Sequence, residues 1–240
     1  MSARTRTVVA ALLLPVALAG CSGGGHQGTA DADGRPGSAQ AALAALPVKK
    51  AASKDGYDRA KQFGAAWTDS TSAPGGGNKC DTRNDILRRD LKNPRFEAGS
   101  KCVIASGTLA DPYTGKTIRF ERGPKSSAVQ IDHIVALSDA WQTGARKLPQ
   151  DRREALANDP LNLVAADGPA NMGKGDKNAS AWLPADKSFG CTYVARQIAV
   201  KKQYKLWVTP DERDAMKKVL AGCPAQQLPS ESTPGVALKS

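Results

Sequence analysis

The chain has 240 residues, of which 40% are hydrophobic, 24% charged and 5% aromatic. This length allows one ordinary hydrophobic core or two small ones and excludes a large multidomain assembly. Lys and Arg number 34 against 23 Asp and Glu, giving a net charge of +11. Such a charge favours anionic partners such as nucleic acid, anionic lipid or acidic cell-wall polymer. The chain has two histidines, and His26 lies in a glycine-rich stretch, so any imidazole-dependent step must fall on His133.

Residues 1–20 have the features of a lipoprotein signal peptide. Arg4 and Arg6 precede an apolar run at residues 8–18 that is too short to span a bilayer. The Leu-Ala-Gly-Cys segment that ends at Cys21 resembles the lipobox of bacterial lipoproteins, in which the signal is cut before the cysteine and that cysteine is acylated. We therefore expect lipidation of Cys21, an extracytoplasmic location, and membrane attachment through this lipid anchor only. The alternative is a plain secretory signal.

The composition of the two ends sets the expected limits of the folded domain. Residues 21–42 are rich in Gly, Ala and Asp, which predicts a flexible tether with little to bury. Residues 224–240 are similarly loose and are expected to form a disordered tail. The folded domain is therefore expected over residues 43–223, a comfortable size for one domain, and is expected to be a monomer.

The cysteines other than Cys21 predict disulfides. They are Cys80, Cys102, Cys191 and Cys223, an even number in a chain expected to be exported. Three pairings are possible. We favour the pairing of neighbours along the sequence, Cys80 with Cys102 and Cys191 with Cys223, because each would close a short loop beside a predicted element. A structural zinc site is the alternative, although the usual Cys-x-x-Cys spacing is absent.

Apolar periodicity and turn residues predict a mixture of helices and short strands. The predicted helices lie at residues 57–67, 81–91, 136–144, from about 170, 193–206 and 210–220. The predicted strands and short apolar segments lie at residues 102–109, 116–122, 128–131 and 161–165, and the Asp-Pro-Tyr-Thr-Gly turn at residues 111–115 joins the first two strands in a hairpin. Asp81 is a plausible N-cap for the second helix, which Pro94 is expected to end. The fold class is therefore α+β, with short strands among helices.

The candidate chemistry begins where a predicted strand ends on Asp132 and His133. Neighbouring strand residues point to opposite faces, so both side chains can serve one site only if the backbone turns there. Further along, Asn162 lies in an apolar segment, and Asn171 is followed three residues later by Lys174. An isolated Asp–His pair is usually a surface pair, and each of these features alone is a weak signal. Their order along the chain makes them specific.

In this order the residues resemble the HNH nucleases, in which an Asp-His-Ile-Val segment is followed by a middle Asn and then by Asn-x-x-Lys. The matching positions are residues 132–135, Asn162 and residues 171–174. Three further segments resemble a family of exported bacterial HNH domains related to the C-terminal domain of modification-dependent restriction enzymes, at residues 80–84, 111–115 and 181–184. The resemblance implies a ββα-metal (HNH, His-Me finger) core embedded in additional helices and a short hairpin.

The resemblance also implies a division of roles among the motif residues. His133 would be the general base that removes a proton from the attacking water. Asp132 and Asn171 would hold one divalent cation at the scissile phosphate and the leaving 3′ oxygen. Carboxylate and amide oxygens suit Mg²⁺ or Mn²⁺ better than zinc. Many HNH relatives have a His where Asn171 stands, so the binding of the metal is expected to be weak.

The remaining motif residues are expected to position the loop or contact the substrate. Asn162 would use its amide to hold the loop that presents His133, as part of the catalytic machinery. Lys174 would be a catalytic residue that contacts a phosphate of the substrate, and Arg122 is a weaker candidate for a second phosphate contact.

We therefore expect an exported, metal-dependent HNH endonuclease, either lipid-anchored or secreted. It would hydrolyse phosphodiester bonds of DNA, or alternatively RNA, to leave 5′-phosphate and 3′-hydroxyl ends. Sequence specificity is expected to be low because no sequence-reading module is recognisable. One alternative is a non-catalytic nucleic-acid-binding surface lipoprotein on the same fold. Another is a cell-wall hydrolase, although the small number of histidines argues against a zinc-dependent one.

Overall fold

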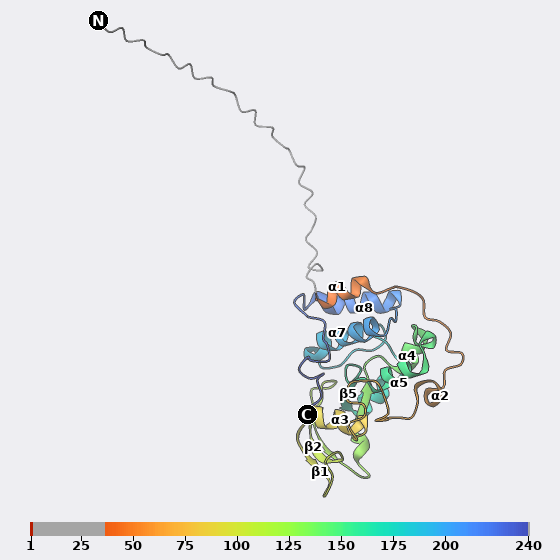
Figure 1. Cartoon of the computed structure of the whole chain (residues 1–240), viewed down its shortest axis with the longest axis vertical. Coiled ribbons are helices and arrows are strands. Elements are labelled where there is room, and N and C mark those ends of the chain that lie inside the picture. Colours follow the sequence, from red (N-terminus) through yellow and green to blue (C-terminus); the bar gives the residue numbers. More distant parts are fainter. Residues whose placement is uncertain (2–36, 240) are drawn as a thin grey trace. The chain divides into compact units, whose positions relative to one another are not determined.

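The structure is a computed structural model that describes Met1 and residues 37–239 (Figure 1). The expected lipidation site Cys21 and all of the expected signal peptide except Met1 lie outside the described residues, as does most of the expected tether. In the described part of the chain, no helix combines the length and the apolar composition that a membrane crossing requires.

The described residues form an α+β fold, as the sequence predicts. The helices are α1 (Ala39–Ala45), α2 (Arg59–Phe63), α3 (Thr82–Asp90), α4 (Leu137–Gln142), α5 (Gln150–Asn158), α6 (Gly168–Lys174), α7 (Lys187–Gln203) and α8 (Pro210–Ala221). The strands are β1 (Leu91–Phe96), β2 (Ile104–Ala110), β3 (Thr117–Glu121), β4 (Val129–His133) and β5 (Leu163–Asp167).

The strands form two separate antiparallel sheets. One has the order β1-β2-β3, and its β2-β3 hairpin is the one predicted from the sequence. The other pairs β4 with β5, so that Asp132 lies opposite Val164 and His133 opposite Leu163. Helices α4 and α5 lie in the connection between these two strands, and α6 follows β5 directly. The chain therefore forms a strand–strand–helix unit with a helical insertion.

The β4-β5 pair is buried on both faces. On one face, Ile131 and Leu163 belong to an apolar cluster shared with α3 and the three-stranded sheet. On the other face, Val164 and Ala166 belong to a cluster shared with α1, α7 and α8, three helices that pack on one another (Figure 1). Alternate strand residues point to opposite faces, so both layers hold the end of β4 in place.

Capping residues explain where several helices begin. Asp81 accepts a hydrogen bond from the backbone of Asn84, which confirms it as the N-cap of α3. Thr209 caps α8 in a capping box with Glu212. Helix α2 is shorter than the predicted helix at residues 57–67, because Gly64 follows it with φ +74 and the chain leaves the helical conformation there.

The structure corrects the predicted limits of the domain and adds one strand. Helix α1 buries Ala39 and Ala42 against α7 and α8, and Val236 near the other end is 2% exposed, so the folded part extends beyond residues 43–223. Helix α3 ends at Asp90, close to the predicted end at residue 91, and the chain continues directly into β1, a strand that was not predicted. Pro94 is tolerated because β1 is an edge strand whose pairing with β2 is irregular there.

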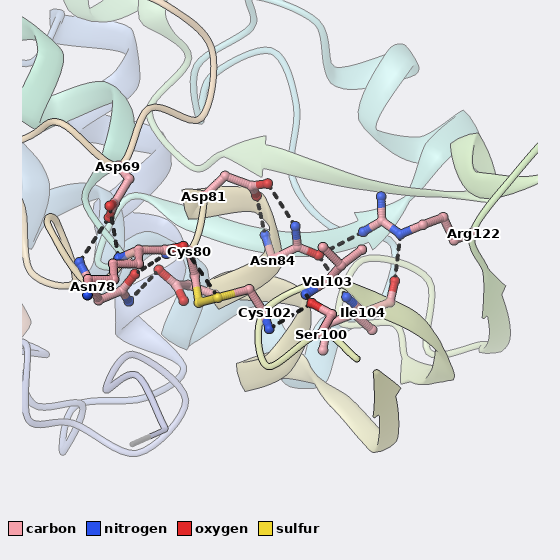
Figure 2. Close-up of a disulfide and its surroundings, with 12 residues drawn as sticks. Asp69, Asn78, Cys80, Asp81, Asn84, Ser100, Cys102, Val103, Ile104 and Arg122 are labelled. Carbon is pink, nitrogen blue, oxygen red and sulfur yellow. Dashed lines mark hydrogen bonds between the residues drawn. A yellow bond between two sulfur atoms is a disulfide. The ribbon is translucent and has the colours of Figure 1, made fainter. Parts of the chain in front are cut away.

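Both disulfides join the cysteines that are neighbours along the sequence, the pairing favoured above. Cys80 is bonded to Cys102, and Cys191 in α7 is bonded to Cys223 just after α8. Figure 2 shows the first bond, which ties the segment before α3 to the segment before β2. Beside it, the Asn84 side chain accepts a hydrogen bond from the backbone of Ile104 at 2.9 Å. The disulfide and this amide therefore fasten α3 to the hairpin.

Candidate functional site

The backbone turns directly after the Asp–His pair, and Asn162 holds this turn. The backbone N–H of Ile134 donates to the Asn162 carbonyl at 2.7 Å, and that of Val135 donates to Asn162 Oδ1 at 2.8 Å. Asn162 Nδ2 in turn donates to the carbonyl of Leu156 in α5 at 3.2 Å. Asn162 is fully buried. These hydrogen bonds hold the loop that follows His133 in place.

Two buried arginines support the segment that carries Asn162. Arg89 from α3 and Arg196 from α7 are 5% and 3% exposed. Both donate to the backbone carbonyls of Pro160 and Leu163, and Arg196 also donates to that of Leu161. Burial lowers the pKa of Arg196 to about 9. Sequence reasoning missed this support, because an arginine in a basic pair or within a helix has no local signal of burial.

The hydrogen bond of the His133 ring determines which of its nitrogens can act as a base. Nε2 lies 2.8 Å from the carbonyl oxygen of Ala157 at the end of α5. A carbonyl only accepts, so Nε2 carries the proton and Nδ1 keeps a free lone pair. The ring stacks on Trp67, with centroids 5.5 Å apart and planes 12° apart. Burial, followed by the charge of Arg59, lowers the pKa of His133 to about 3, so the ring is neutral near neutral pH.

The side chain of Asp132 contacts different residues from the side chain of His133. Its carboxylate lies 3.0 Å from the ammonium of Lys174 and accepts a short hydrogen bond from the Tyr113 hydroxyl. Lys174 also donates to the His133 carbonyl at 2.8 Å. Burial raises the pKa of Asp132, although Lys174 and Tyr113 oppose this effect. Sequence reasoning missed Tyr113, which lies in the predicted Asp-Pro-Tyr-Thr-Gly turn.

The expected phosphate contact of Lys174 is contradicted by its burial. Lys174 is the last residue of α6, and its side chain is fully buried between this helix and β4. Its ammonium is already bonded to Asp132 and to the His133 carbonyl. Lys174 is therefore an internal counter-ion at the end of β4 and does not reach the surface where a phosphate would bind.

Asn171 lies on α6, across from β4. Its Nδ2 donates to Gln130 Oε1 at 2.8 Å. Within residues 37–239, no hydrogen bond to Asn171 Oδ1 is present. Asn171 lines a cavity of about 260 Å³ together with Asp132 and His133. The structure thus brings together three of the sequence-predicted site residues around one hollow.

Arg122 does not belong to this hollow. Its guanidinium donates to the carbonyl of Ile104 at 2.8 Å and to Asn84 Oδ1 at 2.7 Å (Figure 2). It also lies 3.5 Å from Glu97. Arg122 therefore does not line the candidate site, because its side chain is directed to the junction of α3 and β2. Its contact with a substrate phosphate stays a prediction.

A larger cavity elsewhere has a different character. It measures about 590 Å³ and lies between α7 and the C-terminal segment, lined by Leu161, Lys202, Gln203 and residues 228–232 among others. It includes none of Asp132, His133 and Asn171. The chemistry-bearing residues therefore select the smaller cavity as the candidate active site.

Comparisons with known proteins identify the family of the chain. Residues 81–219, more than half of the chain, match the family model described as GmrSD restriction endonucleases, C-terminal domain. The chain is also similar to an "Uncharacterized secreted protein" of Arthroderma benhamiae, with 35% identity over 187 residues, 77% of this chain and 84% of that protein. That relative is fungal, whereas the sequence resemblance pointed to a bacterial family. No solved structure matches the chain. The matched family points to a nuclease-related function, and the chain belongs to the family of GmrSD restriction endonuclease C-terminal domains.

Proposed function

We propose that this protein is a metal-dependent endonuclease of the HNH type that hydrolyses phosphodiester bonds. The observation that carries the proposal is the unit β4-β5-α6, in which β4 ends on His133 and α6 places Asn171 on the wall of the same cavity. This arrangement has the order of elements of a ββα-metal core. The match to a restriction endonuclease family supports the same chemistry.

His133 is the general base in this proposal. With Nε2 donating to Ala157, the neutral ring can accept a proton from water through Nδ1. Trp67 stacks on the ring, and Asn162 holds the chain that follows it. A base that is fixed in this way stays in the orientation that proton transfer requires.

Asp132 and Asn171 are the residues that would hold the divalent cation. Oδ1 of Asp132 accepts one hydrogen bond, from Lys174, so it retains a lone pair, and Asn171 Oδ1 is available as described above. Both are hard oxygen donors, which suit Mg²⁺ or Mn²⁺. Within residues 37–239, no group of three or more His, Cys, Asp and Glu side chains could hold a metal ion. When bound, the cation would offset the charge that develops at the scissile phosphate and the leaving oxygen.

Lys174 has a supporting role in this scheme. Its buried ammonium favours the charged form of the Asp132 carboxylate, which burial disfavours. A carboxylate kept negative is a better metal ligand than a carboxylic acid. The lysine therefore contributes to metal binding through Asp132 rather than through the substrate.

The substrate in this proposal is DNA, with RNA as the second possibility. The charge of +11 favours a phosphate backbone, and cleavage is expected to show little dependence on sequence. Two disulfides fit an extracytoplasmic location, as does the secreted relative. Lipidation of Cys21, with a plain secretory signal as the alternative, completes the proposed localisation.

A plasmid-cleavage assay tests the proposal. The purified protein is incubated with supercoiled plasmid and Mg²⁺ or Mn²⁺, and a chelator is added to a parallel sample. We expect nicked and linear products that disappear with the chelator, and we expect Asn171→Ala to need more metal for the same rate. DNA that is retarded but uncut with every divalent ion would instead support the non-catalytic nucleic-acid-binding lipoprotein.

A further inference from the structure

Arg59 lies outside the segment that matches the family model, yet it lines the candidate active site. It is the first residue of α2, and the family match begins at residue 81. The cavity that Arg59 lines also contains Asp132, His133 and Asn171. An N-terminal segment that precedes the matched domain therefore forms one wall of the site.

Arg59 supplies a positive charge to the wall of the cavity. Among the described residues that line the cavity, it is the only lysine or arginine. It is exposed, and within residues 37–239 its guanidinium forms no hydrogen bond or ion pair with another side chain or with the backbone. Asp176, a carboxylate that also lines the cavity, is instead paired with Lys54 at 2.7 Å.

The two cations expected from the sequence to contact phosphate are committed elsewhere. The ammonium of Lys174 is buried against Asp132, and the guanidinium of Arg122 is bonded to Asn84 and a backbone carbonyl. Without Arg59, the described residues that line the cavity would therefore include no lysine or arginine to bind an anionic substrate.

We propose that Arg59 binds a backbone phosphate of the nucleic acid next to the scissile bond, so that the substrate strand lies between α2 and α6. A guanidinium can donate two parallel hydrogen bonds to phosphate oxygens, which a lysine cannot reproduce. This inference rests on the proposed function, because the phosphate is that of the nuclease substrate.

The test combines cleavage and binding of one short DNA duplex. The variants are Arg59→Gln and Arg59→Lys, with Lys61→Gln as the matched control. Lys61 lies on the same helix and is highly exposed, but it does not line the cavity. Cleavage is measured with Mg²⁺ as kcat/KM. Binding is measured in chelator over a series of salt concentrations, and thermal unfolding checks that each variant folds.

We expect Arg59→Gln to lower kcat/KM about tenfold and to reduce the slope of log affinity against log salt by about 1. Arg59→Lys should keep the slope and recover part of the rate, while Lys61→Gln should stay close to wild type in both. An Arg59→Gln variant with unchanged slope and rate overturns the inference. If wild type binds but never cleaves, the nuclease proposal fails while the salt slope still decides the role of Arg59. If wild type neither binds nor cleaves, both proposals are wrong.

Discussion

The Ala157 carbonyl oxygen lies 2.8 Å from Nε2 of His133 and therefore leaves Nδ1 as the basic nitrogen. Ala157 belongs to α5, in the connection between β4 and β5. The helical insertion thus fixes which nitrogen of the His133 ring carries the proton. A ring held by one hydrogen bond can still tilt, and the stacked Trp67 limits that motion.

Replacing Trp67 tests whether the stacking positions the ring. We expect Trp67→Ala to lower kcat about tenfold with little change in KM, because a misplaced base slows proton transfer but does not remove a substrate contact. Trp67→Phe keeps an aromatic plane beside His133 and should retain most of the rate. Steady-state kinetics and thermal unfolding of both variants provide the check. Equal kcat for Trp67→Ala and wild type would show that the stacking is not needed.

Removing the buried ammonium of Lys174 should destabilise the fold strongly. We expect Lys174→Met to lower the free energy of unfolding by about 3 kcal/mol or more, since Asp132 would remain buried without its partner. Adding Asp132→Asn should recover part of the loss. Urea denaturation measures both changes. Lys177→Met is the control, because Lys177 lies just after α6 and is exposed. Similar small losses for Lys174→Met and Lys177→Met would contradict the buried ion pair.

Asn162 should matter for both stability and rate. In Asn162→Ala, the backbone N–H of Val135 loses its acceptor and the Leu156 carbonyl loses its donor. We expect a loss of about 2 kcal/mol in the free energy of unfolding and a lower kcat from the displaced loop. Asn162→Asp can still accept from Val135 but places a carboxylate beside the Leu156 carbonyl, so it should be at least as unstable. A variant with normal stability and normal kcat would rule out the holding role.

The pH dependence of stability provides a test in α3. Burial raises the pKa of Asp85 from 3.8 to about 6. The folded protein therefore binds more protons than the unfolded chain between about pH 4 and about pH 6, and stability falls as pH rises through this window. We expect Asp85→Asn to flatten this part of the curve in urea denaturation. Asp151→Asn, an exposed change in the first turn of α5, should leave the slope unchanged. An unaltered slope in Asp85→Asn would refute the assignment.

Much of the fold could be predicted because its signals are local. Helix α3 has a capping Asp81 and apolar residues at helical spacing, and the β2-β3 hairpin has a turn sequence between its strands. Helix α1 was missed because its alanine-rich sequence has few large apolar residues, and it is stabilised by docking on α7 and α8. Strand β1 was missed because Pro94 argues against a strand unless the strand lies at an edge.

The sequence predicted which residue types would form the site, but not where the charged side chains of Lys174 and Arg122 would point. Asp132, His133 and Asn171, which the order of the motif residues predicts to share one site, line one cavity. The sequence cannot show that Lys174 turns inward or that Arg122 binds the α3–β2 junction, since both directions depend on tertiary packing. Arg59 was missed because an exposed arginine in a short helix looks like any solvated charge.

The most direct test of the central claim compares the two histidines in the same cleavage assay. We predict that His133→Ala loses at least about a hundredfold in kcat, while its thermal unfolding stays cooperative and its binding to DNA in chelator is retained. His26→Ala, in the expected tether, is the matched control and should cleave like wild type. A His133→Ala protein that cleaves plasmid at the wild-type rate would contradict the account.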